Sequence, residues 1–117
     1  MNVLAVGCHP DDVELLCGGT VAKYARAGHN VYVTHLAIGD MGHDTMDPDE
    51  LAALRMEEAR EAARVLGAQY VPVRCCRDFE VDAGSREQQV ALGKLIRKIR
   101  PDVVLAPCPT DYMRDHN

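Results

Sequence analysis

Three polar residues near the N-terminus have the types and spacing of a catalytic metal site. His9 and Asp12 lie three positions apart, directly after an apolar run, and a tight turn into a helix would point both side chains at one ion. Imidazole and carboxylate are normal zinc ligands, and a catalytic zinc has three protein ligands and an open position for water. His116 is the predicted third ligand. Asp11 is then free to act as general base for a water whose pKa zinc lowers to about 7.

Both segments also have ordinary structural interpretations. A single histidine before a helix commonly caps it or makes a hydrogen bond, and adjacent aspartates at a helix start commonly serve as N-cap and dipole residues. The combination favours the metal site, because His-Pro-Asp-Asp at 9–12 follows the first predicted strand and Asp-His at 115–116 follows the last. Chance would rarely place both groups at the same end of a sheet.

Four strands and three helices are predicted to position these residues. Apolar, β-branched runs predict strands, and apolar residues at helical spacing predict helices. The strands are expected at 2–7, 31–38, 70–73 and 103–106, and the helices at 12–27, 48–66 and 85–100. Asp47 and Ser85 are the expected N-caps of the second and third helices. Leu16 and Leu54 are expected on the buried faces of the first and second.

The alternation of strands and helices predicts an α/β fold with a Rossmann-like parallel sheet. Right-handed crossovers give the strand order 3-2-1-4 with helices on both faces. The first and fourth strands then adjoin at the switch point, where ligands bind outside the carboxyl ends of the strands. The loops at that point, 8–12 and 107–117, carry the residues named above. A dinucleotide site is excluded, because G-x-G-x-x-G does not follow the first strand and two carboxylates would repel a pyrophosphate.

The composition is that of one soluble globular domain and argues against several functions. The net charge is -5 and Lys and Arg form no run, which argues against a nucleic-acid partner. No apolar stretch approaches the ~18 residues of a membrane span. The five cysteines are an odd number without a C-x-x-C pair, so we expect reduced thiols, a cytoplasmic location and no catalytic cysteine.

The predicted sheet also indicates that more protein is needed to complete the fold. A sheet that ends at its fourth strand would leave apolar surface and an unpaired edge uncovered. We therefore expect residues 1–117 to be the N-terminal portion of a single, longer domain. Association with another copy, as a homo-oligomer, is the other way to cover this surface.

Two segments carry a family resemblance. Ala-Val-Gly-Cys-His-Pro-Asp-Asp-Val-Glu at 5–14, with Cys-Gly-Gly-Thr at 17–20, and Asp-Tyr-Met-Arg-Asp-His at 111–116 are similar to the two metal motifs of the LmbE-like or PIG-L deacetylases. The resemblance implies a zinc-dependent hydrolase that removes an N-acetyl group from a glucosamine-containing sugar or conjugate. It implies that His9, Asp12 and His116 bind Zn²⁺ and that Asp11 is the general base. Members of this family usually have about twice this length.

Two further residues are predicted to contact substrate. Arg55, in the predicted helix 48–66, matches a position that helps bind substrate in relatives, and a surface ion pair would explain it equally well. Asp40 follows the second strand and is expected to line the pocket, with a turn residue as the alternative interpretation.

One position departs from the family pattern. The second motif commonly reads His-x-Asp-His, whereas Met113 stands at the first histidine here. A thioether cannot donate a hydrogen bond or carry positive charge. Either another residue polarises the substrate carbonyl or catalysis is weaker, and Asp115, which would orient that histidine, is left without an assigned role. This departure supports an alternative hypothesis, a non-catalytic sugar-binding relative that keeps the fold, with or without the metal.

Overall fold

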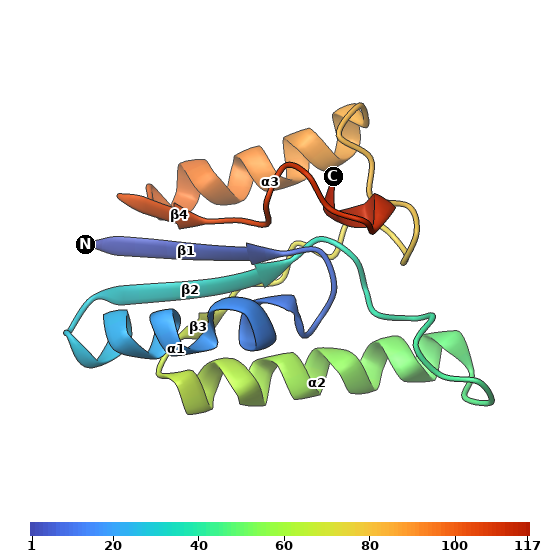
Figure 1. Ribbon diagram of the computed structural model, residues 1–117, viewed down its shortest axis with the longest axis horizontal. Coiled ribbons are helices and arrows are strands. Elements are labelled where there is room, and N and C mark those ends of the chain that lie inside the picture. The colour runs from blue at the N-terminus through green and yellow to red at the C-terminus, as the bar shows by residue number, and fades with distance from the viewer.

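The computed structural model describes all residues, 1–117, and contains one parallel sheet with helices packed on it (Figure 1). The strand order is β3-β2-β1-β4, which confirms the predicted order 3-2-1-4. The strands are β1 (Asn2–Gly7), β2 (Asn30–His35), β3 (Gln69–Tyr70) and β4 (Val103–Leu105). Because every pairing is parallel, the carboxyl ends of all strands meet at one edge of the sheet.

Three α-helices connect the strands and cover both faces. They are α1 (Asp12–Arg26), α2 (Pro48–Leu66) and α3 (Arg86–Ile99), and a 3₁₀ helix, η1 (Arg114–His116), follows β4. α1 and α2 lie on one face and α3 on the other (Figure 1). The side chains of Asp47 and Ser85 accept hydrogen bonds from the first turns of α2 and α3, so both predicted N-caps are confirmed. No helix combines the length and apolar character that a membrane crossing requires.

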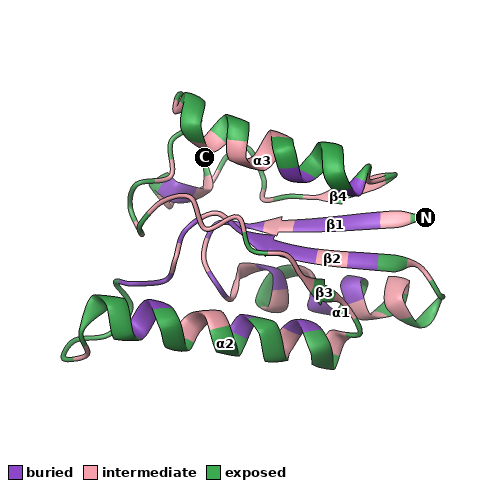
Figure 2. Cartoon of the chain, turned by 180° about the vertical axis from the view of Figure 1, so that it is seen from behind, coloured by how far each residue is buried: buried purple, intermediate pink, exposed green.

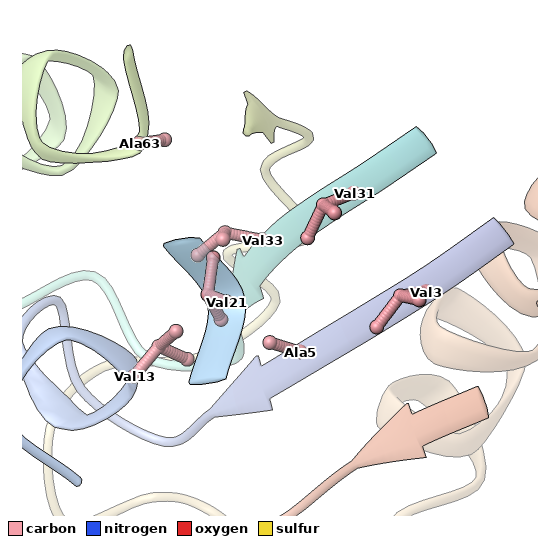
Figure 3. Close-up of a cluster of buried hydrophobic side chains, with 7 residues drawn as sticks. All are labelled: Val3, Ala5, Val13, Val21, Val31, Val33 and Ala63. Atoms are coloured by element: carbon pink, nitrogen blue, oxygen red, sulfur yellow. The ribbon is translucent and has the colours of Figure 1, made fainter. Parts of the chain in front are cut away.

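Two apolar layers hold the helices to the sheet. Figure 2 shows the burial concentrated along the central strands β1 and β2. On the face covered by α3, Leu4 of β1 packs against Leu95 and Ile99. Central strands covered on both faces are largely apolar, as β1 is after Asn2. On the α1 and α2 face, seven buried side chains form one cluster (Figure 3): Val3, Ala5, Val13, Val21, Val31, Val33 and Ala63.

The strand ends differ from the prediction. β2 stops at His35 instead of continuing to Ile38, and β3 occupies Gln69–Tyr70 instead of 70–73. Past these points the backbone is joined to its neighbours only by isolated hydrogen bonds and one isolated bridge. β-branched and apolar residues in these segments therefore lie beside the sheet without forming a regular ladder.

Two leucines expected in the core are exposed, so this part of the prediction was wrong. Leu16 of α1 is 72% exposed and Leu54 of α2 is 44% exposed. Their helical neighbours Val13 and Leu51 are buried. Val21 and Ala59, farther along the same helices, are also buried, so both leucines lie to the side of the covered stripe. Helical spacing identifies residues that share a broad face, but it does not fix which part of that face meets the sheet.

Candidate metal centre

The loop after β1 turns sharply into α1. The backbone N–H of Asp11 donates to the carbonyl of His9 at 2.8 Å, which closes the turn. Gly7, the last residue of β1, allows this approach, because a Cβ there would lie 2.9 Å from Cδ2 of His35 and 3.0 Å from Cβ of Asp12. A larger residue at this position would push the turn away from β2.

The side chain of Asp12 points back at the turn instead of capping α1. Its Oδ2 accepts hydrogen bonds from the backbone N–H groups of Cys8, at 2.8 Å, and His9, at 2.9 Å. Asp11, at the N-cap position, makes no side-chain capping bond. The alternative interpretation of the two aspartates as helix caps therefore finds no support in the hydrogen bonding.

His116 reaches the same carboxylate from the other end of the sequence. η1 places its Nε2 at 3.4 Å from Oδ2 of Asp12, and its Nδ1 at 3.2 Å from Oδ2 of Asp111. Both ring nitrogens are buried, and neither has a hydrogen-bond partner with acceptable geometry. Buried polar atoms without a partner are uncommon and call for an explanation, of which an ion is one.

Asp111 is positioned to orient the His116 ring. The pKa of the Asp111 carboxyl is lowered from its usual value. The largest cause is the hydrogen bond from the backbone N–H of Met113, and the second is the neighbouring His116 side chain. A carboxylate beside one ring nitrogen favours the proton on that nitrogen and leaves the lone pair of the other nitrogen free. Histidines that bind metals commonly have this arrangement. The sequence analysis assigned Asp111 no such role.

His9 lies beside this pair and is held by Asp115. Its Nε2 lies 2.8 Å from Oδ2 of Asp115, and its Nδ1 lies 3.8 Å from Oδ2 of Asp12. Its ring centroid is 5.5 Å from that of His116. Asp115 is almost fully buried and also accepts the backbone N–H of Phe79 at 2.7 Å. The structure thus gives Asp115, which had no assigned role, the position of a residue that orients His9.

The two contacts of Asp12 have a spacing close to that of ligands around a small tetrahedral cation. With bonds of about 2.0–2.2 Å to zinc, neighbouring ligand atoms in a tetrahedron lie about 3.3 Å apart. The two contacts to Asp12, 3.4 Å from His116 and 3.8 Å from His9, are close to that value. The donor types and the two Asp12 contacts fit zinc, whereas His9 lies outside the group whose donor atoms are all within 4.8 Å of one another and would have to move towards it.

Cys8 is a further candidate donor, although no catalytic role was predicted for any cysteine. The group whose donor atoms all lie within 4.8 Å of one another is Cys8, Asp12 and His116, and it does not include His9. The Cys8 thiol donates to the carbonyl of Asp115 at 2.9 Å. Burial, reinforced by the neighbouring carboxylates, raises the pKa of this thiol to about 12, so without a metal it stays protonated.

Asp11 and Arg55 form an ion pair at the mouth of the site. Nη2 of Arg55 lies 2.9 Å from Oδ2 of Asp11 and 2.8 Å from the carbonyl oxygen of Pro10, while Nη1 binds Glu58 at 2.6 Å. The Asp11 side chain is 49% exposed, so it remains open to the pocket. The contacts of Arg55 give it a role in fixing Asp11, and its contact with substrate stays a prediction.

A pocket of about 700 Å³ opens in front of these residues. His9, Asp11, Asp12, Arg55 and His116 all line it, together with parts of the loop after β2 and the start of α2. Its position outside the carboxyl ends of β1 and β2 is the one expected of a ligand site in this sheet topology. A cavity of this size accommodates a small organic molecule.

A buried polar pair lies beneath the turn. Nε2 of His35, at the end of β2, lies 3.5 Å from Oε2 of Glu14 in the first turn of α1. Burial opposes ionisation of Glu14, but attraction to His35 and, to a lesser extent, Arg55 lowers the pKa of its carboxyl overall. The pair ties α1 to β2 and so helps to fix the turn that carries Asp11 and Asp12.

Comparison with known proteins places the chain in a family. Residues 4–117 match the family described as PIG-L, GlcNAc-PI de-N-acetylase. The chain belongs to the PIG-L family. The match covers both segments of the candidate metal centre, the turn after β1 and the loop that ends in η1.

Similar proteins within this comparison have different activities. The diacetylchitobiose deacetylase of Thermococcus kodakarensis is 36% identical over 112 residues, which are 92% of this chain and 41% of the relative. The N,N'-diacetylchitobiose deacetylase of Pyrococcus horikoshii, solved with its inhibitor MPG, has a TM-score of 0.89 at 36% identity, over 98% of this chain and 45% of that one. The 4-carboxy-2-hydroxymuconate hydratase of Pseudomonas putida KT2440 has a TM-score of 0.88 at 28% identity, over 98% and 50%. This chain spans about half the length of these relatives.

Asp40 does not line the pocket of this PIG-L chain, and its contact with substrate stays a prediction. Its buried carboxylate accepts hydrogen bonds from Arg77, at 2.5 Å, and from the backbone N–H of Asp78, at 3.0 Å. The turn interpretation was nearer to the structure, since Asp40 ties the loop after β2 to 77–78. Its neighbours Gly39 and Met41 do line the pocket.

Gly39 joins this loop to the metal turn, which leads to a first prediction. It has a φ of +78°, and a Cβ there would lie 2.8 Å from Cγ of Pro10 and 3.1 Å from Cβ of Arg55. Gly39→Ala should therefore lower the free energy of unfolding by about 1–3 kcal/mol, measured by urea denaturation. Gly42→Ala, in the same loop with open space at its Cβ and no positive φ, is the matched control and should change it little. Equal effects of the two substitutions would contradict this account of Gly39.

Proposed function

We propose that the protein is a zinc-dependent amide hydrolase that removes the N-acetyl group from a glucosamine-containing sugar or sugar conjugate. The observation that carries this proposal is the approach of His116 to Asp12, at 3.4 Å, on the wall of a pocket that Asp11 also lines. Membership of the PIG-L family and the similarity to two diacetylchitobiose deacetylases support the same reaction class.

His9, Asp12 and His116 would hold the zinc, in keeping with their donor types and with the contacts of both histidines to Asp12. When bound, zinc supplies a Lewis acid for the amide carbonyl and lowers the pKa of water at its open position. Two backbone N–H groups fix the coordinating oxygen of Asp12, and Asp115 and Asp111 orient the two rings. Such outer contacts set the direction of the ligand electron pairs before the ion arrives.

Asp11 would carry the proton through the reaction. Arg55 binds its Oδ2, which directs the carboxylate at the pocket and leaves Oδ1 free. In the proposed reaction Asp11 accepts a proton from the attacking water and returns it to the departing amine nitrogen, so that acetate and a free amine are produced. Arg55 acts here as a positioning residue for the base.

Met113 lines the pocket but cannot help in this step, because its thioether has no proton to donate. In relatives that carry histidine at this position, the ring is expected to stabilise the negative charge that develops on the substrate oxygen. Here that charge would be stabilised without residue 113. The proposed enzyme would therefore depend more heavily on its metal than a relative with the histidine.

A second candidate is a metal-dependent hydratase. It is favoured by the similarity to the 4-carboxy-2-hydroxymuconate hydratase, which differs little in TM-score from the similarity to the deacetylase. The same residues would serve it, since addition of water to a carbon–carbon double bond also needs an activated water and a proton carrier. The non-catalytic sugar-binding relative, suggested by Met113, is the third outcome to be tested.

Release of acetate separates these possibilities. The full chain, loaded with zinc, should produce equal amounts of acetate and free amine from N-acetylglucosamine or diacetylchitobiose, and chelation should abolish the activity until zinc is restored. Consumption of 4-carboxy-2-hydroxymuconate, followed by its ultraviolet absorbance, without acetate release would identify the hydratase. If calorimetry detected sugar binding and neither reaction occurred, the protein would be a non-catalytic sugar-binding relative.

A further inference from the structure

Cys8 provides the metal centre with a donor that the proposed reaction does not use. Its sulfur lies in the tight group with Asp12 and His116, all within 4.8 Å, and its side chain is buried. Nε2 of His116, which lies 3.4 Å from Asp12 in this group, is buried and has no hydrogen-bond partner. A thiol, a carboxylate and an imidazole are together a ligand set for a thiophilic cation, for which sulfur outranks oxygen.

The donors are divided between two cavities. His9, Asp11 and Asp12 line the 700 Å³ pocket, whereas Cys8 lines a separate cavity of about 250 Å³ on the α3 side of the sheet. His116 borders both cavities. The donor atoms of Cys8, Asp12 and His116 all lie within 4.8 Å of one another, so an ion that moved from the His9 side towards the Cys8 side could keep Asp12 and His116 as ligands while exchanging the third.

We propose that Cys8, Asp12 and His116 form a second, overlapping metal position that takes a thiophilic divalent cation such as Cd²⁺. This position shares Asp12 and His116 with the zinc position, so only one of the two positions is occupied at a time. The inference rests on the proposed function. Binding breaks the S–H bond of Cys8 and forms a sulfur–metal bond. The thiol proton passes to solvent, and the hydrogen bond from Sγ to the carbonyl of Asp115 is lost.

Cd²⁺ titration of the full chain tests this position. The wild type should develop the near-ultraviolet charge-transfer absorption of a thiolate–cadmium bond, with a plateau at about one Cd²⁺ per chain. Cys8→Ser and Cys8→Ala should lose this band and bind Cd²⁺ at least about 10- to 100-fold more weakly, because the loss of a ligand should cost no less than the loss of an outer contact. The serine and alanine side chains are no larger than that of cysteine, and thermal unfolding verifies that each variant is folded.

Cys76→Ala is the matched control, because Cys76 is also partly buried near the end of β2 but lies outside the donor group. It should keep the band. A band that persists in Cys8→Ala, or Cd²⁺ that binds to the wild type without one, would overturn the inference. Zinc content is measured separately. Zinc bound normally without a cadmium–thiolate band would refute only the Cys8 position, whereas absence of zinc from the metal-replete wild type would refute the proposed function as well.

Discussion

Asp11→Asn is expected to lower kcat for deacetylation by about 100- to 10,000-fold while zinc content stays at the wild-type level. The amide has nearly the shape of the carboxylate and keeps an oxygen that can accept the hydrogen bond from Arg55, but it cannot take a proton from water. Because Asp11 is not among the proposed ligands, the metal should be retained. Steady-state kinetics and elemental analysis of the same preparations give both quantities.

Asp44→Asn is the control for this substitution. Asp44 is exposed in the loop before α2 and does not line the pocket, so its loss should leave kcat within about a factor of two, as for other surface substitutions. An Asp11→Asn enzyme that kept most of its kcat would rule out Asp11 as the general base. A variant that lost its zinc would instead identify Asp11 as part of the metal site.

His116→Ala is expected to have the largest effect on the metal, with zinc affinity reduced by more than about 100-fold. Loss of an outer contact to a ligand typically costs 10- to 100-fold, and loss of the ligand itself should cost at least as much. The substitution removes the buried imidazole that lies 3.4 Å from Asp12. Competition with a zinc-binding dye measures the affinity, and acetate release should fall in parallel.

His29→Ala is the matched histidine control. His29 lies in the turn between α1 and β2, at the opposite edge of the sheet, where its ring contacts Tyr24 at a centroid distance of 5.7 Å. It should leave zinc affinity unchanged. Zinc bound equally well by His116→Ala and by the wild type would show that the loop after β4 does not contribute to the metal site.

The approach of the two metal segments could be predicted because it follows from topology. Parallel strands in the order 3-2-1-4 bring the ends of β1 and β4 together, and the turn at His9 and the loop before His116 follow those ends directly. The caps Asp47 and Ser85 were equally predictable, because capping depends on a residue and the next three along the chain. Where geometry is local or set by strand order, the sequence pattern is sufficient.

The contacts around those segments could not be predicted, because they depend on side-chain directions across the fold. The Asp115 carboxylate joins His9 to the backbone of Phe79, which belongs to the loop before α3, and no spacing in the sequence indicates that meeting. The same holds for Arg55 and Asp11, and for the proximity of Cys8 to His116. The contact of Asp40 with Arg77 is of the same kind, because Arg77 comes from a segment whose path was not predicted.

The contact between His9 and Asp115 joins residues that are 106 positions apart, and this separation sets the order of events during synthesis. The turn after β1 leaves the ribosome first, yet its proposed partner His116 is among the last of these 117 residues to be made. A nascent chain cannot complete the centre until β4 has joined β1 and the following loop has emerged. Metal capture would then wait until the loop after β4 has emerged, and cells starved of zinc would accumulate chains in which this loop remains undocked and accessible to proteases.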